Sequence, residues 1–374
     1  ANAQAAGRAS KQDGTEQQIH EDRGVTGVGL SGNQCYPPII RQREDTSLAG
    51  AGHQQLMSEP TSQAFWITQP GHGEIQSSPL PDLPAGWVQV RTLFSGISRG
   101  TEALVWQGRV PASQSDRMRA PRQMGEFPGP VKYGYSNVGV IEKGPGQWIG
   151  QTVFCLHPHE TRYQAPLDQV HLLPPGLDPA RAVLAANVET AINGCWDAMP
   201  RIGERITVIG AGVVGTLTAA LCHAVPGVQL ELVDTNPERE PLARALGLPF
   251  VTPATATPGV DQVIHASGSQ AGLDLALRLG GDEAAITALS WYGDQPVSVP
   301  LGSDFHPRRL TLRSSQVGQI APDMRPRWDT GRRLGLALHL LATHSEWAVL
   351  IDGESPFEAL PRTMASVANG HGLC

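Results

Sequence analysis

The stretch RITVIGAGVVGTLTAAL, residues 205–221, combines a short apolar run, a glycine-rich turn and a second apolar run of helical length. Gly210, Gly212 and Gly215 fit the pattern G-x-G-x-x-G, and Asp234 ends the next strand-like run about twenty residues later. A strand, a glycine turn, a helix and an acid at this spacing form a dinucleotide-binding βαβ unit. The stretch therefore predicts a parallel sheet that binds a dinucleotide. The alternative is a glycine turn that only packs a strand against a helix.

Each glycine has a separate task in such a turn. Gly210 allows the tight bend, Gly212 lets the backbone approach a pyrophosphate, and Gly215 lets helix and strand pack closely. Val213 and Val214 lie at the start of the expected helix. Free N–H groups and the positive end of the helix dipole attract phosphates there. We therefore expect all five residues to contact the cofactor.

The acid at Asp234 bears on which nucleotide is used. Its carboxylate can accept hydrogen bonds from an adenosine ribose diol, and it would repel a 2′-phosphate. The chain continues Asp234-Thr235-Asn236-Pro237, with no Lys or Arg directly after the acid. We therefore expect NAD as the cofactor. NADP is the alternative, because Arg239 follows soon afterwards.

Strand-like and helical runs alternate around this stretch. Strands are expected at RITVIG (205–210), LELVD (230–234), DQVIHASG (261–268), AAITALSW (284–291) and LTLRSSQVG (310–318). Such alternation predicts an α/β fold, with a doubly wound parallel sheet and helices on both faces. Further helices are expected at 332–345 and at 178–199, the latter with Asp178 as its cap ahead of Pro179.

Short apolar runs separated by Gly and Pro fill the region before residue 175. Strands are expected at 64–68, 86–94, 136–144, 151–157 and 169–174, which is typical of a compact β domain without a long helix. Residues 1–60 are rich in Gly, Gln and Ser and lack an apolar period, so we expect a disordered extension. Met57 is a candidate natural start, and the abrupt end at GHGLC suggests missing C-terminal residues.

Composition excludes several classes of protein. The 374 residues carry 28 Lys and Arg against 35 Asp and Glu, a net charge of −7, which argues against a nucleic-acid partner. Apolar residues at 40% and charged residues at 17% exclude global disorder. The five cysteines form no CxxC pair, so we expect reduced thiols and a cytoplasmic location. Residues 206–225 carry no formal charge, but their glycines argue against a membrane span.

Several longer strings point to one family. They are SGISRGTE (95–102), VKYGYSNVGVIEKGPG (131–146), VFCLHPHETRY (153–163), SWYGD (290–294), FHPRRLTLRSSQVG (305–318) and RPRW (325–328). With the central GAGVVG unit, residues 62–374 resemble the medium-chain dehydrogenase/reductase superfamily, which includes alcohol dehydrogenase, sorbitol dehydrogenase and quinone reductase. The resemblance is closest to the branch that contains bacteriochlorophyllide a dehydrogenase.

The resemblance implies a GroES-like β-rich catalytic domain at residues 61–180 and 326–374 and a Rossmann domain at 181–325. It implies an NAD(P)-dependent dehydrogenase that moves a hydride between nicotinamide and an alcohol or carbonyl carbon. A sizeable or cyclic secondary alcohol is the first expectation, and a quinone- or enone-type NADPH reductase is the alternative. A non-catalytic nucleotide-binding redox sensor is the competing class. Family members usually pair through the last Rossmann strand, so a homodimer is expected.

Zinc-dependent members carry a cysteine in a GICGTD-like string and a histidine in a GHE-like string. Here the first string reads GISRGTE (96–102) and the second reads GYS (134–136). Ser98 or Arg99 stands in the cysteine's place, Tyr135 in the histidine's, and only Glu189 survives as a counterpart of a further ligand. A neutral hydroxyl binds Zn²⁺ far less well than thiolate or imidazole does. We therefore expect no catalytic zinc.

Without zinc, other groups must polarise a carbonyl or manage the alcohol proton. Tyr135 can donate to an oxyanion and hand over a proton, or it is only a half-buried aromatic. The resemblance places Ser98, Arg99 and Thr101 on the active-site loop, with Thr101 at a proton-relaying position. Arg99 could stabilise negative charge, or it is a surface arginine.

Two carboxylates and a run of histidines complete the catalytic candidates. Glu102 could orient Arg99, and Glu189 could be a base or a salt-bridge partner. Cys155, His157 and His159 alternate at strand spacing. A metal set, hydrogen-bonded structural histidines and a substrate contact remain open for this run.

The resemblance also implies further cofactor contacts on the expected Rossmann domain. They are Ser267 and Gly268 near the adenosine, and Ser290, Trp291, Ser315 and Gln316 near the nicotinamide.

Overall fold

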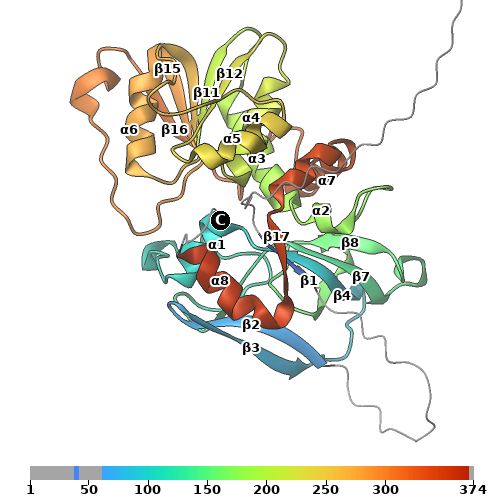
Figure 1. Cartoon of the computed structure of the whole chain (residues 1–374). Helices are drawn as coiled ribbons and strands as arrows, with labels where there is room; N and C mark the ends of the chain where they lie inside the picture. Colours follow the sequence, from blue (N-terminus) through green and yellow to red (C-terminus); the bar gives the residue numbers. More distant parts are fainter. Residues whose placement is uncertain (1–37, 42–60, 370–374) are drawn as a thin grey trace, which may run out of the picture. The chain divides into compact units, whose positions relative to one another are not determined.

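The computed structural model describes residues 38–41 and 61–369, which contain three sheets (Figure 1). The seven-stranded sheet runs β10-β8-β7-β4-β1-β17, and β9 also pairs with β4. Its strands are β1 (Pro38–Arg41), β4 (Trp87–Gly96), β7 (Asn137–Lys143), β8 (Thr152–Cys155), β9 (Arg162–Pro166), β10 (Val170–Leu172) and β17 (Gly353–Pro356). A four-stranded sheet runs β3-β2-β6-β5, with β2 (Thr61–Gln69), β3 (His72–Pro79), β5 (Met124–Gly125) and β6 (Val131–Lys132).

The third sheet is parallel throughout and has the order β13-β12-β11-β14-β15-β16. Its strands are β11 (Arg205–Ile209), β12 (Gln229–Val233), β13 (Phe250–Val251), β14 (Val260–His265), β15 (Gly280–Ala288) and β16 (Thr311–Ser314). The order reverses direction at β11 and β14, as in a doubly wound sheet. The five strands expected around the glycine turn are confirmed.

Eight α-helices accompany the sheets in the described part of the chain. They are α1 (Arg99–Trp106), α2 (Pro179–Ala182), α3 (Ala185–Ala198), α4 (Val213–His223), α5 (Glu240–Ala245), α6 (Gln270–Leu279), α7 (Thr330–Thr343) and α8 (Leu360–Ala368). The parallel sheet buries apolar side chains on both faces because successive strand residues point in opposite directions. Val208 packs in one core with Ala219 of α4, and its neighbour Ile209 packs in another with Leu275 of α6. Helices on both faces are therefore confirmed.

The last helix, α8, completes the core under β2 and β6. Its residues Leu360 and Met364 are buried with Phe65 and Trp106, whose rings stack at a centroid distance of 6.2 Å. The chain therefore returns to the β-rich part at its end.

Three expectations need correction. The single helix expected over 178–199 is two helices, α2 and α3, although Asp178 caps α2 as expected by accepting the Ala180 N–H at 3.0 Å. The interruption coincides with a tertiary bond, because the Val183 carbonyl accepts the hydroxyl of Ser136.

The second correction concerns residues 1–60, of which 38–41 form β1 between β4 and β17. A strand of four residues gains its hydrogen bonds from distant partners, so no local pattern reveals it. The rest of the expected disordered extension, with Met57, lies outside the described residues, as does the GHGLC end. The third correction is that the expected active-site loop is helical, since Arg99, Thr101 and Glu102 lie on α1. No helix within 38–41 and 61–369 is long and apolar enough to cross a bilayer.

Candidate functional site

The carboxyl ends of five parallel strands form one row at the edge of the sheet. Register pairs Ile209 with both Val233 and His265, then His265 with Ala288, and Ala288 with Ser314. Ligands of open α/β sheets bind at such an edge, where the strand order reverses. The residues that follow these ends are expected cofactor contacts, namely Gly210, Asp234, Ser267, Ser290 and Ser315.

The glycine turn has the geometry of a phosphate cradle. Gly210 has a φ of 108°, a left-handed conformation that favours glycine. A Cβ at Gly215 would overlap the carbonyl oxygen of Gly210, so only glycine allows α4 to lie this close to β11. A Cβ at Gly212 would meet nothing within 4 Å. Gly212 therefore borders open space directly before Val213 and Val214, which begin α4, and the residues fit a bound pyrophosphate.

Asp234 is tied to this turn. Its Oδ2 accepts the Ala211 N–H at 2.7 Å, and its Oδ1 accepts the Asn236 N–H at 2.9 Å. Because a carboxylate offers about four acceptor sites, capacity remains for a ribose diol. Arg239, the basis of the NADP alternative, is buried.

The loops after β14 and β15 are joined through His265. Its Nε2 lies 2.9 Å from Ser267 Oγ and its Nδ1 lies 3.3 Å from the Tyr292 hydroxyl. Ser290 Oγ accepts the Gly268 N–H at 2.9 Å and donates to the His265 carbonyl at 3.3 Å. Burial lowers the pKa of His265 to about 4, so the ring is neutral at pH 7. This network fixes the segment in which Ser267, Gly268 and Ser290 lie.

The remaining expected contacts differ in how firmly they are held. Ser315 Oγ donates to Asp197 Oδ2 at 2.6 Å, which anchors it to α3. Trp291 is partly buried and Gln316 is exposed. Trp291 follows the end of β15 and Gln316 follows the end of β16, so both lie beyond the carboxyl ends of this row of strands.

The catalytic candidates gather at the N-terminal end of α1. Tyr135 is partly buried, and burial followed by the charge of Glu102 raises its pKa to about 12. Hydrogen bonding with the hydroxyls of Ser98 and Thr101 acts in the opposite direction. Asn187 Nδ2 of α3 donates to Ser98 Oγ at 3.3 Å. We call the hydroxyls of Tyr135, Ser98 and Thr101, together with the Asn187 amide that donates to Ser98, the hydroxyl cluster.

Glu102 does not orient Arg99, and that expectation is wrong. Its Oε1 accepts the Ser98 backbone N–H at 2.7 Å, and its Oε2 lies 2.7 Å from His159 Nε2. Glu102 is only 1% exposed, whereas Arg99 is exposed to solvent. The carboxylate thus holds the start of α1, and the structure leaves Arg99 outside the hydroxyl cluster.

Glu189 lies in a buried ion pair, which is the salt-bridge alternative. Its Oε1 accepts Arg333 Nε at 3.0 Å, and Arg333 also donates to Asn193 Oδ1 and to the Val317 carbonyl, each at 2.5 Å. Arg333 is 1% exposed and Glu189 is 5% exposed. Burial raises the pKa of Glu189, and Arg333 opposes that rise. The pair fastens α3 to α7.

Arg333→Met should lower the free energy of unfolding by about 3–5 kcal/mol, because it leaves the Glu189 charge buried without its partner. Urea denaturation measures the loss. The double variant Arg333→Met/Glu189→Leu is expected to recover most of it, since an apolar pair removes the buried charge. A stable Arg333→Met protein that has lost turnover would instead favour the role of Glu189 as a base.

The residues at the family's zinc positions do not fit a zinc ion. Ser98 and Tyr135 are neutral hydroxyls, and Glu189 is committed to Arg333. Among residues 61–369, no group of three or more His, Cys, Asp or Glu side chains could hold a metal. The Cys155, His157 and His159 run is not such a group, because His157 stacks on Tyr163 at 3.8 Å while His159 contacts Glu102.

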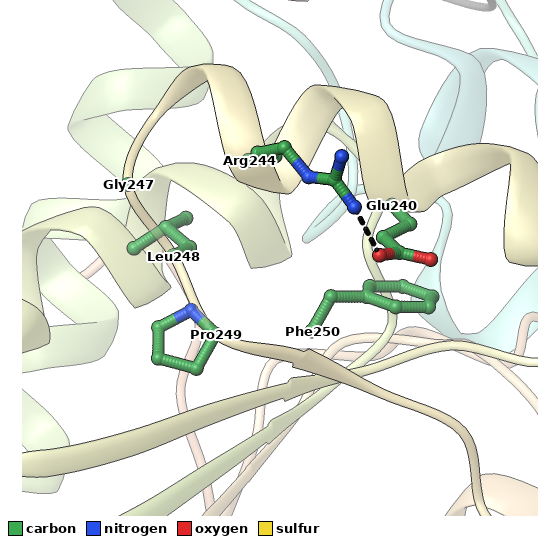
Figure 2. A pocket seen from close by; sticks show the side chains of 6 residues that line it. All are labelled: Glu240, Arg244, Gly247, Leu248, Pro249 and Phe250. Carbon is green, nitrogen blue, oxygen red and sulfur yellow. Dashed lines mark hydrogen bonds and ion pairs between the residues drawn. The ribbon is translucent and has the colours of Figure 1, made fainter.

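A separate hollow lies beside the edge strand β13 (Figure 2). The ion pair between Glu240 and Arg244, 2.6 Å long, spans α5 at its rim. Its lining consists of Glu240, Arg244, Gly247, Leu248, Pro249 and Phe250. No expected site residue is among them, so we do not assign the function to this hollow.

Sequence reasoning missed Asn187 and Ser95 and left the role of His159 open. Ser95 Oγ lies 2.5 Å from His159 Nδ1, across 64 positions of sequence. A polar residue inside the apolar run AVLAANV (182–188) was a signal for Asn187. No local signal marks Ser95.

Comparison with known proteins agrees with this geometry. No family model matches the chain. The 2-desacetyl-2-hydroxyethyl bacteriochlorophyllide A dehydrogenase of Rhodobacter capsulatus is 30% identical over 268 residues, 65% of this chain and 77% of that protein. L-threonine 3-dehydrogenase of Bacillus velezensis is 25% identical over 162 residues, 40% of this chain and 46% of that protein. The chain therefore spans less than half of this second relative.

Solved structures share the fold. Alcohol dehydrogenase TADH of Thermus sp. ATN1 has a TM-score of 0.66 at 20% identity, over 83% of this chain and 98% of that one. An alcohol dehydrogenase of Escherichia coli CFT073, complexed with NADH, has a TM-score of 0.65 at 17% identity, over 84% and 97%. The fold is thus a GroES-like β-rich part with a Rossmann sheet. On the match to the Rhodobacter protein, the chain belongs to the medium-chain dehydrogenase/reductase superfamily.

Proposed function

We propose that the chain is an NAD(P)-dependent dehydrogenase that moves a hydride between nicotinamide and an alcohol or carbonyl carbon, without catalytic zinc. The observation that carries the proposal is the open glycine cradle at Gly212, set in a row of five parallel strand ends. Membership of the superfamily and the NADH in the related E. coli structure support a nicotinamide cofactor. The expected domain bounds, residues 61–180 with 326–374 and residues 181–325, are part of the proposal.

The chain's own groups would serve the bound cofactor and substrate in different ways. Gly212 and the start of α4 hold the pyrophosphate, and Asp234 holds the adenosine ribose. When bound, the nicotinamide supplies or accepts a hydride at its C4. Tyr135 stays protonated at neutral pH because its pKa is raised to about 12. Its hydroxyl therefore donates to the substrate oxygen as negative charge develops there.

The hydroxyl cluster then returns a proton to the Tyr135 hydroxyl. Ser98 and Thr101 interact with the Tyr135 hydroxyl, and hydroxyls both donate and accept. A proton that Tyr135 gives to the substrate is replaced through these hydroxyls by a proton from solvent, to which the partly exposed Ser98 has access. Because the phenol is protonated at neutral pH, Tyr135 is ready to donate a proton and not to accept one, which favours the carbonyl-reducing direction there.

NAD is the proposed cofactor. The glycine motif puts the Asp234 carboxylate beside the adenosine ribose, where its charge would repel a 2′-phosphate. NADH is therefore expected to bind more tightly than NADPH in a fluorescence titration of the purified protein. Tighter binding of NADPH would contradict this assignment and favour the enone-reductase alternative.

The variant Asp234→Asn tests the assignment of NAD by changing this one side chain. The amide keeps the size of the side chain but turns an N–H₂ toward one of two backbone N–H donors. The Kd of NADH should rise about 10-fold or more, since a charge-assisted hydrogen bond contributes roughly 1.5–3 kcal/mol. The preference for NADH over NADPH should shrink as well. The control is Glu238→Gln, which removes an exposed charge from the same loop and should leave the preference unchanged.

The activity is tested with a panel of secondary alcohols and carbonyl compounds, cyclic ones included. Turnover that survives removal of metal by a chelator supports the zinc-free form. Cofactor binding without turnover across the panel favours the redox-sensor alternative. A small-molecule substrate, a homodimer and a cytoplasmic location complete the proposal. They rest on the resemblance and on the cysteine usage.

A further inference from the structure

We propose that His159 is a positioning residue that sets the hydroxyls of α1 against Tyr135. The inference rests on the proposed function, because it concerns the placement of the groups that move the proton. His159 is 0% exposed and touches the segments on both sides of the hydroxyl cluster. One set of contacts, which we call the first arm, connects His159 to α1 through Glu102. The other set, the second arm, connects it to the residues just before Tyr135.

The first arm is a directed chain of hydrogen bonds. The Ser136 carbonyl already accepts the Gly96 N–H at 2.9 Å. The Ser95 hydroxyl lies 3.2 Å from the same carbonyl and 2.5 Å from His159 Nδ1. Because the Glu102 carboxylate can only accept, Nε2 carries the ring proton, and Nδ1 accepts the Ser95 hydroxyl over the shorter distance. In that tautomer the Nε2–H donates to Glu102 Oε2 at 2.7 Å, because a neutral imidazole has one donor and one acceptor.

The chain ends at the first turn of α1. Glu102 Oε1 accepts the Ser98 N–H at 2.7 Å. This N–H is at the N-cap, where no side-chain cap from Ser98 itself is present. A buried carboxylate held from both sides thus fixes the start of the helix. That start carries Ser98 and Thr101.

The second arm fixes the approach to Tyr135. The His159 N–H donates to the Tyr133 carbonyl at 3.2 Å. A Cβ at Gly134 would come within 2.8 Å of His159 Cδ2, so the ring lies flush against this residue. Gly134 has a φ of 115°, which also favours glycine. One imidazole therefore sets the distance between the helix hydroxyls and the phenol.

A misplacement of about 1 Å in reacting groups can cost about 100-fold in rate. His159→Leu removes the donor to Glu102 and should lower kcat by about 100-fold on that basis. The Kd of NADH should stay as in the wild type, because the cofactor contacts lie at the ends of the parallel strands. His159→Gln keeps an amide donor near the place of Nε2 and should recover much of kcat.

The matched control is His157→Leu. His157 is another buried histidine, two positions away, which stacks on Tyr163 and does not contact Glu102. This variant should lose stability, but it should keep the kcat of the wild type. Equal kcat losses in His157→Leu and His159→Leu would overturn the proposal. A rise in KM alone for His159→Leu would overturn it too.

A milder variant keeps the proposal testable if His159→Leu fails to fold. Ser95→Ala removes only the partner of Nδ1 and should lower kcat by about 3–10-fold, the effect of one ordinary hydrogen bond. Unchanged kcat in a folded Ser95→Ala protein would contradict the first arm.

Amide hydrogen exchange separates this inference from the proposed function. Peptides that cover residues 96–104 should exchange faster in His159→Leu than in His157→Leu, whether or not a substrate is turned over. If the wild type binds NADH but turns over no substrate, the proposed function fails and exchange alone decides on the positioning. Equal exchange in the two variants would overturn the positioning.

Discussion

Gly215→Ala should destabilise the Rossmann sheet and abolish NADH binding. The added methyl group would overlap the Gly210 carbonyl oxygen, a backbone atom that cannot move aside without distorting the turn. Overpacking of this kind costs about 3 kcal/mol, at the upper end of the usual range. A lower Tm by circular dichroism and the loss of the NADH fluorescence signal are the expected measurements.

Gly212→Ala is the partner experiment, because it separates binding from folding. Gly212 has φ −80° and ψ 179°, which any residue adopts, and its Cβ would meet nothing within 4 Å. The Tm should therefore match the wild type. The methyl group would point into the space that a pyrophosphate needs, so the Kd of NADH should rise about 10-fold or more. Wild-type NADH affinity in Gly212→Ala would show that no phosphate binds at this turn.

Tyr135→Phe should lower kcat by about 100–1000-fold, the usual cost of removing one donor to a developing oxyanion. The ring remains, so packing and the Kd of NADH should not change. Steady-state kinetics in the carbonyl-reducing direction give kcat, and the fluorescence titration gives the Kd. A loss confined to KM would mean that the hydroxyl only binds the substrate.

Tyr133→Phe is the matched control for this variant. The two rings meet edge to face at a centroid distance of 6.1 Å, and Tyr133 is only 4% exposed. Burial also raises the pKa of Tyr133 well above its usual value. Because its hydroxyl is buried, Tyr133→Phe should keep kcat near that of the wild type. Equal losses in the two variants would remove Tyr135 from the proposed mechanism.

Local chemistry made much of the Rossmann sheet predictable. The glycine spacing, the period of the apolar runs and the Asp178 cap all act over a few residues, and the structure confirms each of them. The strand β1 could not be predicted, because its partners lie in β4 and β17. The break between α2 and α3 likewise coincides with a bond from Ser136, 47 positions before Val183.

The site was less predictable than the fold. The resemblance named Ser98, Thr101, Tyr135 and Glu189, but it could not reveal what holds them. Glu102 and Arg99 are three positions apart, a spacing that puts residues near one another on a helix. Burial turns Glu102 to His159 instead. Arg333 pairs with Glu189 across 144 positions, a contact that only the folded chain creates.

The late positions of β17 and α8 in the chain also determine which part of the protein can complete its fold first during translation. Residues 205–314 form the parallel sheet as one continuous stretch, so it can assemble soon after it leaves the ribosome. The β-rich part, although translated first, lacks β17 and the apolar face of α8 until residues 353–368 emerge. Phe65 and Trp106 therefore stay incompletely covered for most of translation. The half of the molecule that is made first is the half that finishes last, and its exposed apolar surface is where a nascent-chain chaperone would be needed.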